Sequence, residues 1–297
     1  AKLAASLVGI GFDMPYSVSG ITERNYYGTG LLVDAARGLV VVDRNTVPVS
    51  IGDVRLTFAG TLEVPGRVEY IHPLHNLAMV SFDPKLIGST PVRAAEFERK
   101  DLAPGESVWV IGLGRDGDIK VRGTQIGDVE PLALPLSRTM QFRDTNLDVA
   151  TLTTTPGVED GVVVDQRGRV RGLWSSFAFE SGRETQQLSR AVGIDVVADM
   201  VERLRDSRPL YSLEAEFTPQ PLSSARRLGL SADWLRQVEE AGGNKRQVLT
   251  ITRLVGGAPA QKLLRQGDLL LAIDGRVVTR FRDVERAVAD KQKVEVT

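Results

Sequence analysis

Two histidines, His72 and His75, are the only imidazoles in the chain. A His-x-x-His spacing can bind a metal ion, and Glu69 and Asp83 lie near enough in the sequence to add carboxylate ligands. The pair precedes an expected strand, however, in which residues three apart face opposite sides. We therefore expect no metal site here, and a solvent-exposed or capping role for both rings.

Three other groups of residues have types that could carry chemistry. Glu159 and Asp160 would provide two carboxylates, but adjacent residues rarely converge on one substrate, so we favour a surface loop. Ser175 and Ser176 lack a histidine in sequence reach to activate them, which favours a polar pair at a strand end. The Gly-Leu-Gly stretch at 112–114 is a turn rather than a dinucleotide fingerprint, because no helix with a third glycine follows.

The composition excludes several classes of site and argues against some classes of partner for this chain. The chain has no cysteine, which excludes disulfides, cysteine nucleophiles and thiolate metal sites. Its 37 basic and 38 acidic side chains give a net charge of -1, so we do not expect nucleic acid as a partner. No apolar run approaches the roughly 18 residues that a membrane span needs. We also expect no cofactor.

The elements that would position any site change character along the chain. From about residue 26 to residue 175, short apolar or alternating runs are separated by turn residues, which predicts an all-β barrel or sandwich. Examples of the expected strands are Leu31–Val33, Leu39–Val42, Val54–Phe58, Val68–Ile71, Leu77–Phe82, Val108–Ile111, Val162–Val164 and Val170–Trp174.

An amphipathic helix follows, and it marks a domain boundary. Apolar residues recur three or four apart over 194–204, and the helix should end before Ser207-Arg208-Pro209. We predict one domain over residues 1–207 and a second over 208–297. In the second we expect strands at 210–217, 248–254 and 268–273, and helices at 222–228, 258–264 and 281–289.

The second domain resembles a PDZ domain. The stretch Gly-Gly-Ala-Pro-Ala at 256–260 looks like the turn that starts a PDZ helix. The stretch at 264–275 resembles the Gly-Asp pair and strand that lead to an Asp-Gly turn in such domains. Gly267 and Gly275 would supply the backbone freedom that these two turns require.

The first domain resembles the HtrA/Deg serine proteases. The stretches 28–34 and 38–47 are similar to the family's opening strands and to its Thr-Asn-x-His-Val segment. The stretch 72–84 resembles its Asp-Leu-Ala-Leu segment, and 157–172 resembles its nucleophile loop. The resemblance implies a mostly β fold: a trypsin-like double β-barrel followed by an α+β PDZ domain.

A narrower resemblance concerns the large HtrA proteins that carry two protease-like copies, the second of which is degenerate. The stretches 39–48 and 137–144 are similar to that second copy. The chain lacks an initiator Met, and its end resembles an interrupted strand. We therefore expect a fragment of a longer protein, with a PDZ domain truncated at its C-terminal end, and the termini identify no compartment.

The resemblance places the three catalytic positions of the family on Asn45, Asn76 and Glu159. An asparagine amide cannot act as a general base near neutral pH, and it carries no charge to stabilise an imidazolium. A carboxylate also cannot replace an activated hydroxyl. The next pair, Asp160-Gly161, would add negative charge where an oxyanion needs hydrogen-bond donors.

The PDZ resemblance also implies a peptide-binding groove. A PDZ domain binds an extended peptide as an added strand. The loop and pocket would involve Leu210, Tyr211, Ser212, Leu213, Val284 and Val288. The family usually has a glycine where Ser212 stands, and ordinary core packing explains Leu213, Val284 and Val288 equally well.

These residues favour a catalytically inactive pseudoprotease with a peptide-binding module. It would act as a scaffold, regulatory or substrate-recognition part of a larger HtrA-type protein involved in protein quality control. Its expected partners are peptide or unfolded-protein segments, an active protease copy in the same parent chain, and a second copy of itself in a homo-oligomer. The alternatives are an active endopeptidase with relocated catalytic groups, and a PDZ adaptor stabilised by the barrel.

Overall fold

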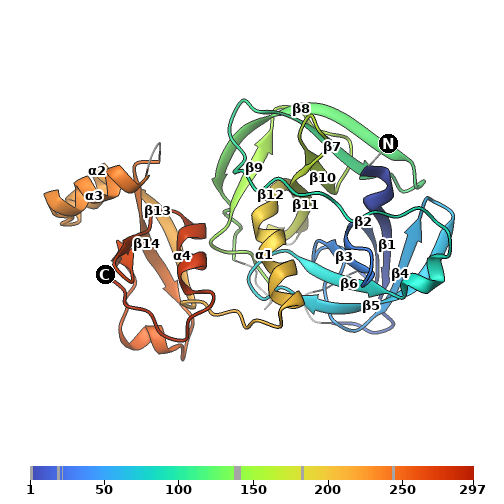
Figure 1. Ribbon diagram of the computed structural model, residues 1–297. Helices are drawn as coiled ribbons and strands as arrows, with labels where there is room; N and C mark the ends of the chain where they lie inside the picture. The colour runs from blue at the N-terminus through green and yellow to red at the C-terminus, as the bar shows by residue number, and fades with distance from the viewer. Residues whose placement is uncertain (1–2, 19–20, 22, 137–141, 182–183, 243–244) are drawn as a thin grey trace. The chain divides into compact units, whose positions relative to one another are not determined.

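The computed structural model describes residues 3–18, 21, 23–136, 142–181, 184–242 and 245–297 (Figure 1). Most of the stretch 137–144, used above for the narrower resemblance, lies outside these residues. The chain forms two compact units, one of residues 1–144 and 149–202, the other of residues 145–148 and 203–297. None of the described helices combines the length and the apolar character needed to cross a membrane.

The first unit contains two closed β-barrels (Figure 1). The first barrel has the strand order β1-β2-β3-β6-β5-β4, and the second has the order β10-β11-β12-β9-β8-β7. The strands of the first are β1 (Leu7–Asp13), β2 (Asn25–Asp34), β3 (Leu39–Val42), β4 (Asp53–Phe58), β5 (Leu62–Ile71) and β6 (Ala78–Phe82). Those of the second are β7 (Ser107–Leu113), β8 (Ile119–Pro131), β9 (Asp148–Leu152), β10 (Gly161–Val164), β11 (Val170–Ser181) and β12 (Glu184–Gly193).

Side-chain alternation explains why these segments form barrels. In β4, Val54, Leu56 and Phe58 are buried and the residues between them are not, as a strand with one face on a core requires. Strand β6, which pairs with β3 and β5, is buried along its whole length. Gly30 allows β2 to approach β3, because a Cβ there would lie 2.5 Å from a methyl carbon of Val40. The result is a mostly β unit with a trypsin-like pair of barrels.

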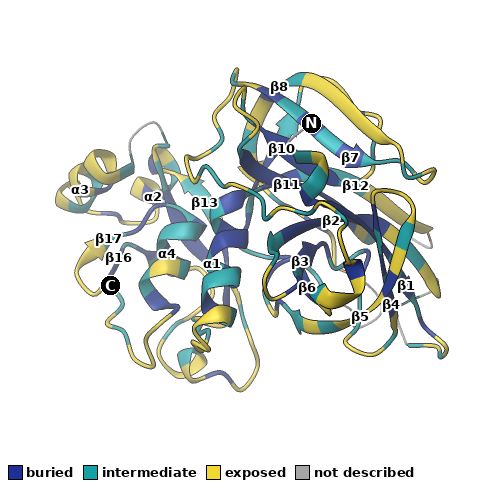
Figure 2. Cartoon of the chain, turned by 45° about the vertical axis from the view of Figure 1, so that its right-hand side comes forward, coloured by how far each residue is buried: buried dark blue, intermediate teal, exposed yellow. Residues whose placement is uncertain are grey.

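Every strand named from the sequence in this unit is present, and four further strands were not named individually: β1, β8, β9 and β12. The pattern of β8 explains part of this failure, since most of its residues are exposed (Figure 2). A strand with few buried positions has little apolar alternation for a sequence pattern to detect. The predicted amphipathic helix is confirmed as α1 (Ile194–Arg205).

The second unit has a three-stranded sheet of order β13-β14-β15 and a two-stranded sheet of β16 and β17. Its strands are β13 (Ala215–Pro221), β14 (Gln247–Leu254), β15 (Leu269–Leu270), β16 (Ala272–Ile273) and β17 (Arg276–Val277). Its α-helices are α2 (Leu222–Arg227), α3 (Ala232–Gly242) and α4 (Phe281–Val288). Short 3-10 helices are η3 (Pro259–Lys262) here, and η1 (Leu3–Ser6) and η2 (Pro84–Ile87) in the first unit.

Two strands expected in the second unit differ in detail from the structure. The expected strand 210–217 begins only at Ala215, because Glu214 has a left-handed backbone (φ 51) that ends an extended run. The preceding segment bonds instead to the end of α4, where the Tyr211 N–H donates to Ala289 O at 3.0 Å. The expected strand 268–273 is divided into β15 and β16, and α3 was not predicted.

Candidate functional site

Asn45 and Asn76 meet at one residue of the second barrel. Asn45 follows β3, and its Nδ2 donates to the Ser176 hydroxyl at 2.7 Å. Asn76 precedes β6, and its Nδ2 donates to the Ser176 backbone carbonyl at 2.6 Å. Two of the three positions expected from the sequence therefore converge on β11, and both contribute neutral amides that donate hydrogen bonds.

Asp43 lies beneath this contact and was missed by the sequence analysis. It is 2% exposed, and its carboxylate accepts hydrogen bonds from the backbone N–H and the hydroxyl of both Thr46 and Ser176, at 2.8 to 3.2 Å. Burial raises the pKa of Asp43, and these four donors oppose that rise. A polar residue directly after the buried run Val40–Val42 was the available signal. Asp43 fixes the turn after β3 to β11.

The third position, Glu159, is exposed, and its backbone carbonyl accepts a bond from the Ser189 hydroxyl at 3.0 Å. The neighbouring Asp160 turns inward, and its carboxylate accepts the Thr29 N–H at 2.9 Å. The surface-loop interpretation therefore describes Glu159 and fails for Asp160. The two adjacent carboxylates point to different surroundings.

Burial raises the pKa of Asp160 to about 7, and the charges of Asp43 and Glu159 add to this rise. The carboxylate and the Thr46 hydroxyl both lie over Gly28. A Cβ on Gly28 would be 2.3 Å from Thr46 Oγ1 and 2.8 Å from Asp160 Oδ2, so only glycine fits there. Thr46 is itself 3% exposed and donates its hydroxyl proton to Asp43, so its hydroxyl is not an accessible nucleophile.

The two histidines are buried, so the expectation of solvent exposure was wrong. His72 is 3% exposed and His75 is 2% exposed, and their rings stack with centroids 4.9 Å apart. The capping role is present for His72, whose Nδ1 accepts the backbone N–H groups of Leu74 and His75 at 3.2 and 3.0 Å. The described residues contain no cluster of three or more metal-ligating side chains.

A second buried group of charges surrounds the turn that holds Asn76. Asp144 is 3% exposed and accepts the Asn76 N–H at 2.7 Å. Burial raises the pKa of Asp144 to about 6, against the opposing charges of His75 and Arg44. The Arg44 guanidinium lies 3.5 Å from the ring centroid of Phe142, and burial lowers its pKa to about 10. These contacts position Asn76 and were not predicted.

Ser175 and Ser176 lie inside a strand rather than at its end, because β11 continues to Ser181. They are 0% and 3% exposed. Both polar groups of the Ser176 backbone are already engaged, the N–H by Asp43 and the carbonyl by Asn76. A cavity of about 610 Å³ in the same unit is lined by Leu7, Tyr27, Thr57, Leu113, Ile119 and their neighbours, and by none of these site residues.

The residues expected to bind a peptide lie in the second unit. Val284 and Val288 are 5% and 3% exposed, and they belong to a core cluster that includes Phe217, with Leu213 packed against it. They therefore serve as core residues in this structure. Leu210 and Tyr211 are half-buried and Ser212 is exposed. The left-handed position of the loop is Glu214 rather than Ser212.

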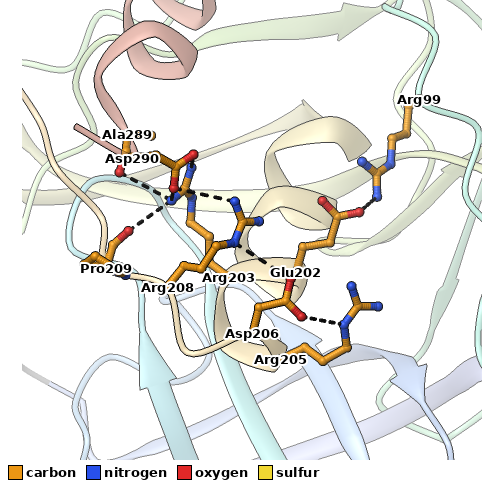
Figure 3. Close-up of polar contacts among 9 residues, drawn as sticks. All are labelled: Arg99, Glu202, Arg203, Arg205, Asp206, Arg208, Pro209, Ala289 and Asp290. Atoms are coloured by element: carbon orange, nitrogen blue, oxygen red, sulfur yellow. Dashed lines mark hydrogen bonds and ion pairs between the residues drawn. The ribbon is translucent and has the colours of Figure 1, made fainter.

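Arg203 holds this loop to the end of α4 (Figure 3). Its guanidinium is buried and donates to the carbonyls of Pro209 and Ala289 at 3.0 and 3.3 Å, and to the Asp290 carboxylate at 2.7 Å. Hydrogen bonds from Arg203 lower the pKa of Asp290. One side chain thereby fixes the spacing of the loop and the helix that would form the two walls of a peptide groove.

No family model matches the chain. It is 30% identical over 291 residues to a PDZ domain-containing protein of Schizosaccharomyces pombe, covering 96% of the chain and 29% of that protein. It is 31% identical over 300 residues to Protease Do-like 7 of Arabidopsis thaliana, with 91% and 27% covered. It is 31% identical over 308 residues to the pro-apoptotic serine protease NMA111 of Yarrowia lipolytica, with 100% and 31% covered.

The chain thus spans less than a third of the length of these curated relatives. Among solved structures, it is similar to HtrA-type protease AlgW with a tripeptide, at a TM-score of 0.65 and 16% identity, covering 100% of this chain and 90% of that one. A variant of the same protease with a tripeptide gives a TM-score of 0.64, with 99% and 89% covered. At this identity the structural likeness supports the fold.

Proposed function

We propose that this chain, which belongs to the HtrA/Deg family of trypsin-like serine proteases with a PDZ domain, is a non-catalytic member that binds peptide segments. In this proposal the barrels are a pseudoprotease and the second unit is a peptide-binding module. The chain would correspond to the degenerate second protease-like copy of a tandem HtrA protein. It would act as a scaffold or substrate-recognition part beside an active copy in the same parent chain.

The state of the two histidines is the observation that carries the proposal. Serine protease chemistry of this family's type needs an imidazole beside an accessible hydroxyl. The chain has two imidazoles, both at most 3% exposed and stacked on one another. The position expected to carry the catalytic base holds Asn45, whose amide donates a hydrogen bond to the Ser176 hydroxyl rather than accepting one.

The names of the relatives favour the competing hypothesis of an active endopeptidase, since two of the three relatives described above are named as proteases. The chain covers only 27% and 31% of the length of these two proteins. Their names are consistent with cleavage by a different segment of such a protein. A PDZ adaptor stabilised by the barrels is the remaining alternative, and it shares the peptide-binding property.

Labelling with a fluorophosphonate separates the first two hypotheses. The chain should remain unlabelled, and should not cleave unfolded casein, under conditions in which an active HtrA-type protease is labelled and cleaves. The chain heated with denaturant serves as the control for non-specific labelling. A covalent adduct that forms on the native chain alone would show that it contains an activated nucleophile, and the proposal would then be wrong.

A peptide-binding test separates the scaffold from a chain with no recognition role. Fluorescent peptides with free, apolar C-terminal residues should bind saturably, and a peptide with an amidated C-terminus should bind less tightly. Analytical ultracentrifugation of the same sample would test the homo-oligomer. The proposed binding to an active protease copy is tested by titrating the chain with the first protease-like copy of a tandem HtrA relative, produced as a separate protein.

A further inference from the structure

The outer edge of β13 is engaged by a side chain from far earlier in the sequence. Among the described strands, β13 pairs only with β14. The Asn146 carboxamide donates to Ala215 O at 2.8 Å and accepts the Phe217 N–H at 2.8 Å. One amide thereby satisfies a carbonyl and an N–H two residues apart, which are the groups that an added strand would use.

The segment that carries Asn146 belongs to the same compact unit, as residues 145–148. Asp148 forms an ion pair with Lys245 at 3.7 Å. Burial raises the pKa of Asp148, while the charges of Lys245 and Arg280 oppose that rise. Arg280 is the N-cap residue of α4. Leu147, between its two polar anchors, is 4% exposed.

The loop before β13 also uses its own polar groups. The Glu214 N–H donates to the Ser212 hydroxyl at 3.2 Å, and the Tyr211 N–H donates to Ala289 O at 3.0 Å. Asn146 and Glu214 both have left-handed backbones, with φ of 55 and 51. Asparagine tolerates that conformation better than most residues, so its identity suits both its backbone and its bonds.

We infer that residues 145–148 are a built-in occupant of the PDZ groove, and that a peptide reaches the edge of β13 only by displacing Asn146. The inference rests on the proposed peptide-binding function of this unit. A peptide strand and the Asn146 amide require the same carbonyl of Ala215 and the same N–H of Phe217. The two states exclude each other, so Asn146 lowers the apparent affinity for any peptide that binds along β13.

The test uses the full chain, its Asn146→Ala variant and a matched Asn25→Ala control, which also removes an asparagine side-chain hydrogen bond, to Asp13 in the first barrel. The probe is a fluorescein-labelled pool of decapeptides with free C-terminal Val, Ile, Leu or Phe. Asn146→Ala should bind the pool about tenfold more tightly than wild type, as the loss of two competing hydrogen bonds predicts. Asn25→Ala should match wild type.

Amide hydrogen exchange tests the occupancy without any peptide. The Phe217 amide should exchange about tenfold faster in Asn146→Ala than in wild type, because its acceptor has been removed. Asn146→Asp is a second variant for the case that Asn146→Ala does not fold. It keeps an acceptor for Phe217 but repels the Ala215 carbonyl, so it should also bind the pool more tightly than wild type.

The outcomes separate this inference from the function on which it rests. Equal, saturable binding by wild type and Asn146→Ala would leave the peptide-binding function standing and overturn the competition. Unchanged exchange at Phe217 would overturn the occupancy itself. Absence of binding by every variant, with faster exchange at Phe217 in Asn146→Ala, would overturn the peptide-binding function and the competition together.

Discussion

The Asn45 amide donates a hydrogen bond to the Ser176 hydroxyl at 2.7 Å, joining the turn after β3 to the middle of β11. The same hydroxyl donates to Asp43 at 3.2 Å. Asn45 therefore donates a hydrogen bond within a structural network, at the position where the resemblance to the HtrA/Deg proteases places the catalytic base. The network links the first barrel to the second within one compact unit.

A double-mutant cycle measures the strength of this link. Asn45→Ala and Ser176→Ala should each lower the free energy of unfolding, and their effects should be non-additive by about 1 kcal/mol, as expected for one partly buried hydrogen bond. Urea denaturation monitored by circular dichroism gives the four free energies. Additive effects within about 0.3 kcal/mol would mean that the contact adds no stability. Asn25→Ala combined with Ser176→Ala provides a distant control pair.

Asp160 should make the protein less stable as the pH rises. Its folded pKa of about 7 lies above the ordinary value of 3.8. Between these two values the folded state binds more protons than the unfolded state, so the free energy of unfolding falls as the pH rises from about 4 to 7. Asp160→Asn, which can still accept the Thr29 N–H, should become more stable relative to wild type over this window, by about 2–4 kcal/mol.

The measurement is urea denaturation of both proteins at several pH values between 4 and 8. Comparing the variant with wild type isolates Asp160 from Asp144, whose pKa is also raised by burial. Asp118→Asn, at an exposed carboxylate, serves as the control substitution. A constant difference between Asp160→Asn and wild type at all pH values would contradict the raised pKa.

The sequence predicted much of the fold because its signals are local and repeated. The buried runs in β3 and β6, the alternation in β4 and the amphipathic pattern of α1 are visible in the residue types alone. The polar contacts were harder to predict, because they join residues far apart in the chain. Asp43 bonds to Ser176 across 133 positions, and Asn146 bonds to Ala215 across 69. The hydrophobic periodicity of a sequence contains no information about such long-range pairs.

Arg203 should stabilise the loop before β13 through the hydrogen bonds that its guanidinium group donates. Arg203→Ala removes donors from the carbonyls of Pro209 and Ala289 and from the Asp290 carboxylate. We expect a loss of about 2 kcal/mol in the local stability of this contact, since hydrogen bonds from a charged group are among the stronger ones. Arg203→Lys should recover little of it, because an ammonium cannot bridge the three acceptors in the same way.

The exchange rate of the Tyr211 amide, which bonds to Ala289, reports this local stability. It should rise about thirtyfold in Arg203→Ala, which corresponds to about 2 kcal/mol. Arg205→Ala is a matched control in the same helix, because its ion pair with Asp206 is half-exposed on both sides. Equal rates in wild type and Arg203→Ala would show that the loop is held by other contacts.

Restoring the family's residues at the three carried-over positions should not restore catalysis. In the variant Asn45→His, Asn76→Asp and Glu159→Ser, the introduced hydroxyl replaces an exposed side chain, while the inward-facing side chain of that turn is Asp160. The carboxylate of Asp160 also remains beside the site and would oppose a developing oxyanion. The triple variant should therefore stay unlabelled by a fluorophosphonate. Labelling of the serine introduced by Glu159→Ser would mean that only the residue types, and not the shape of the turn, separate this chain from an active protease.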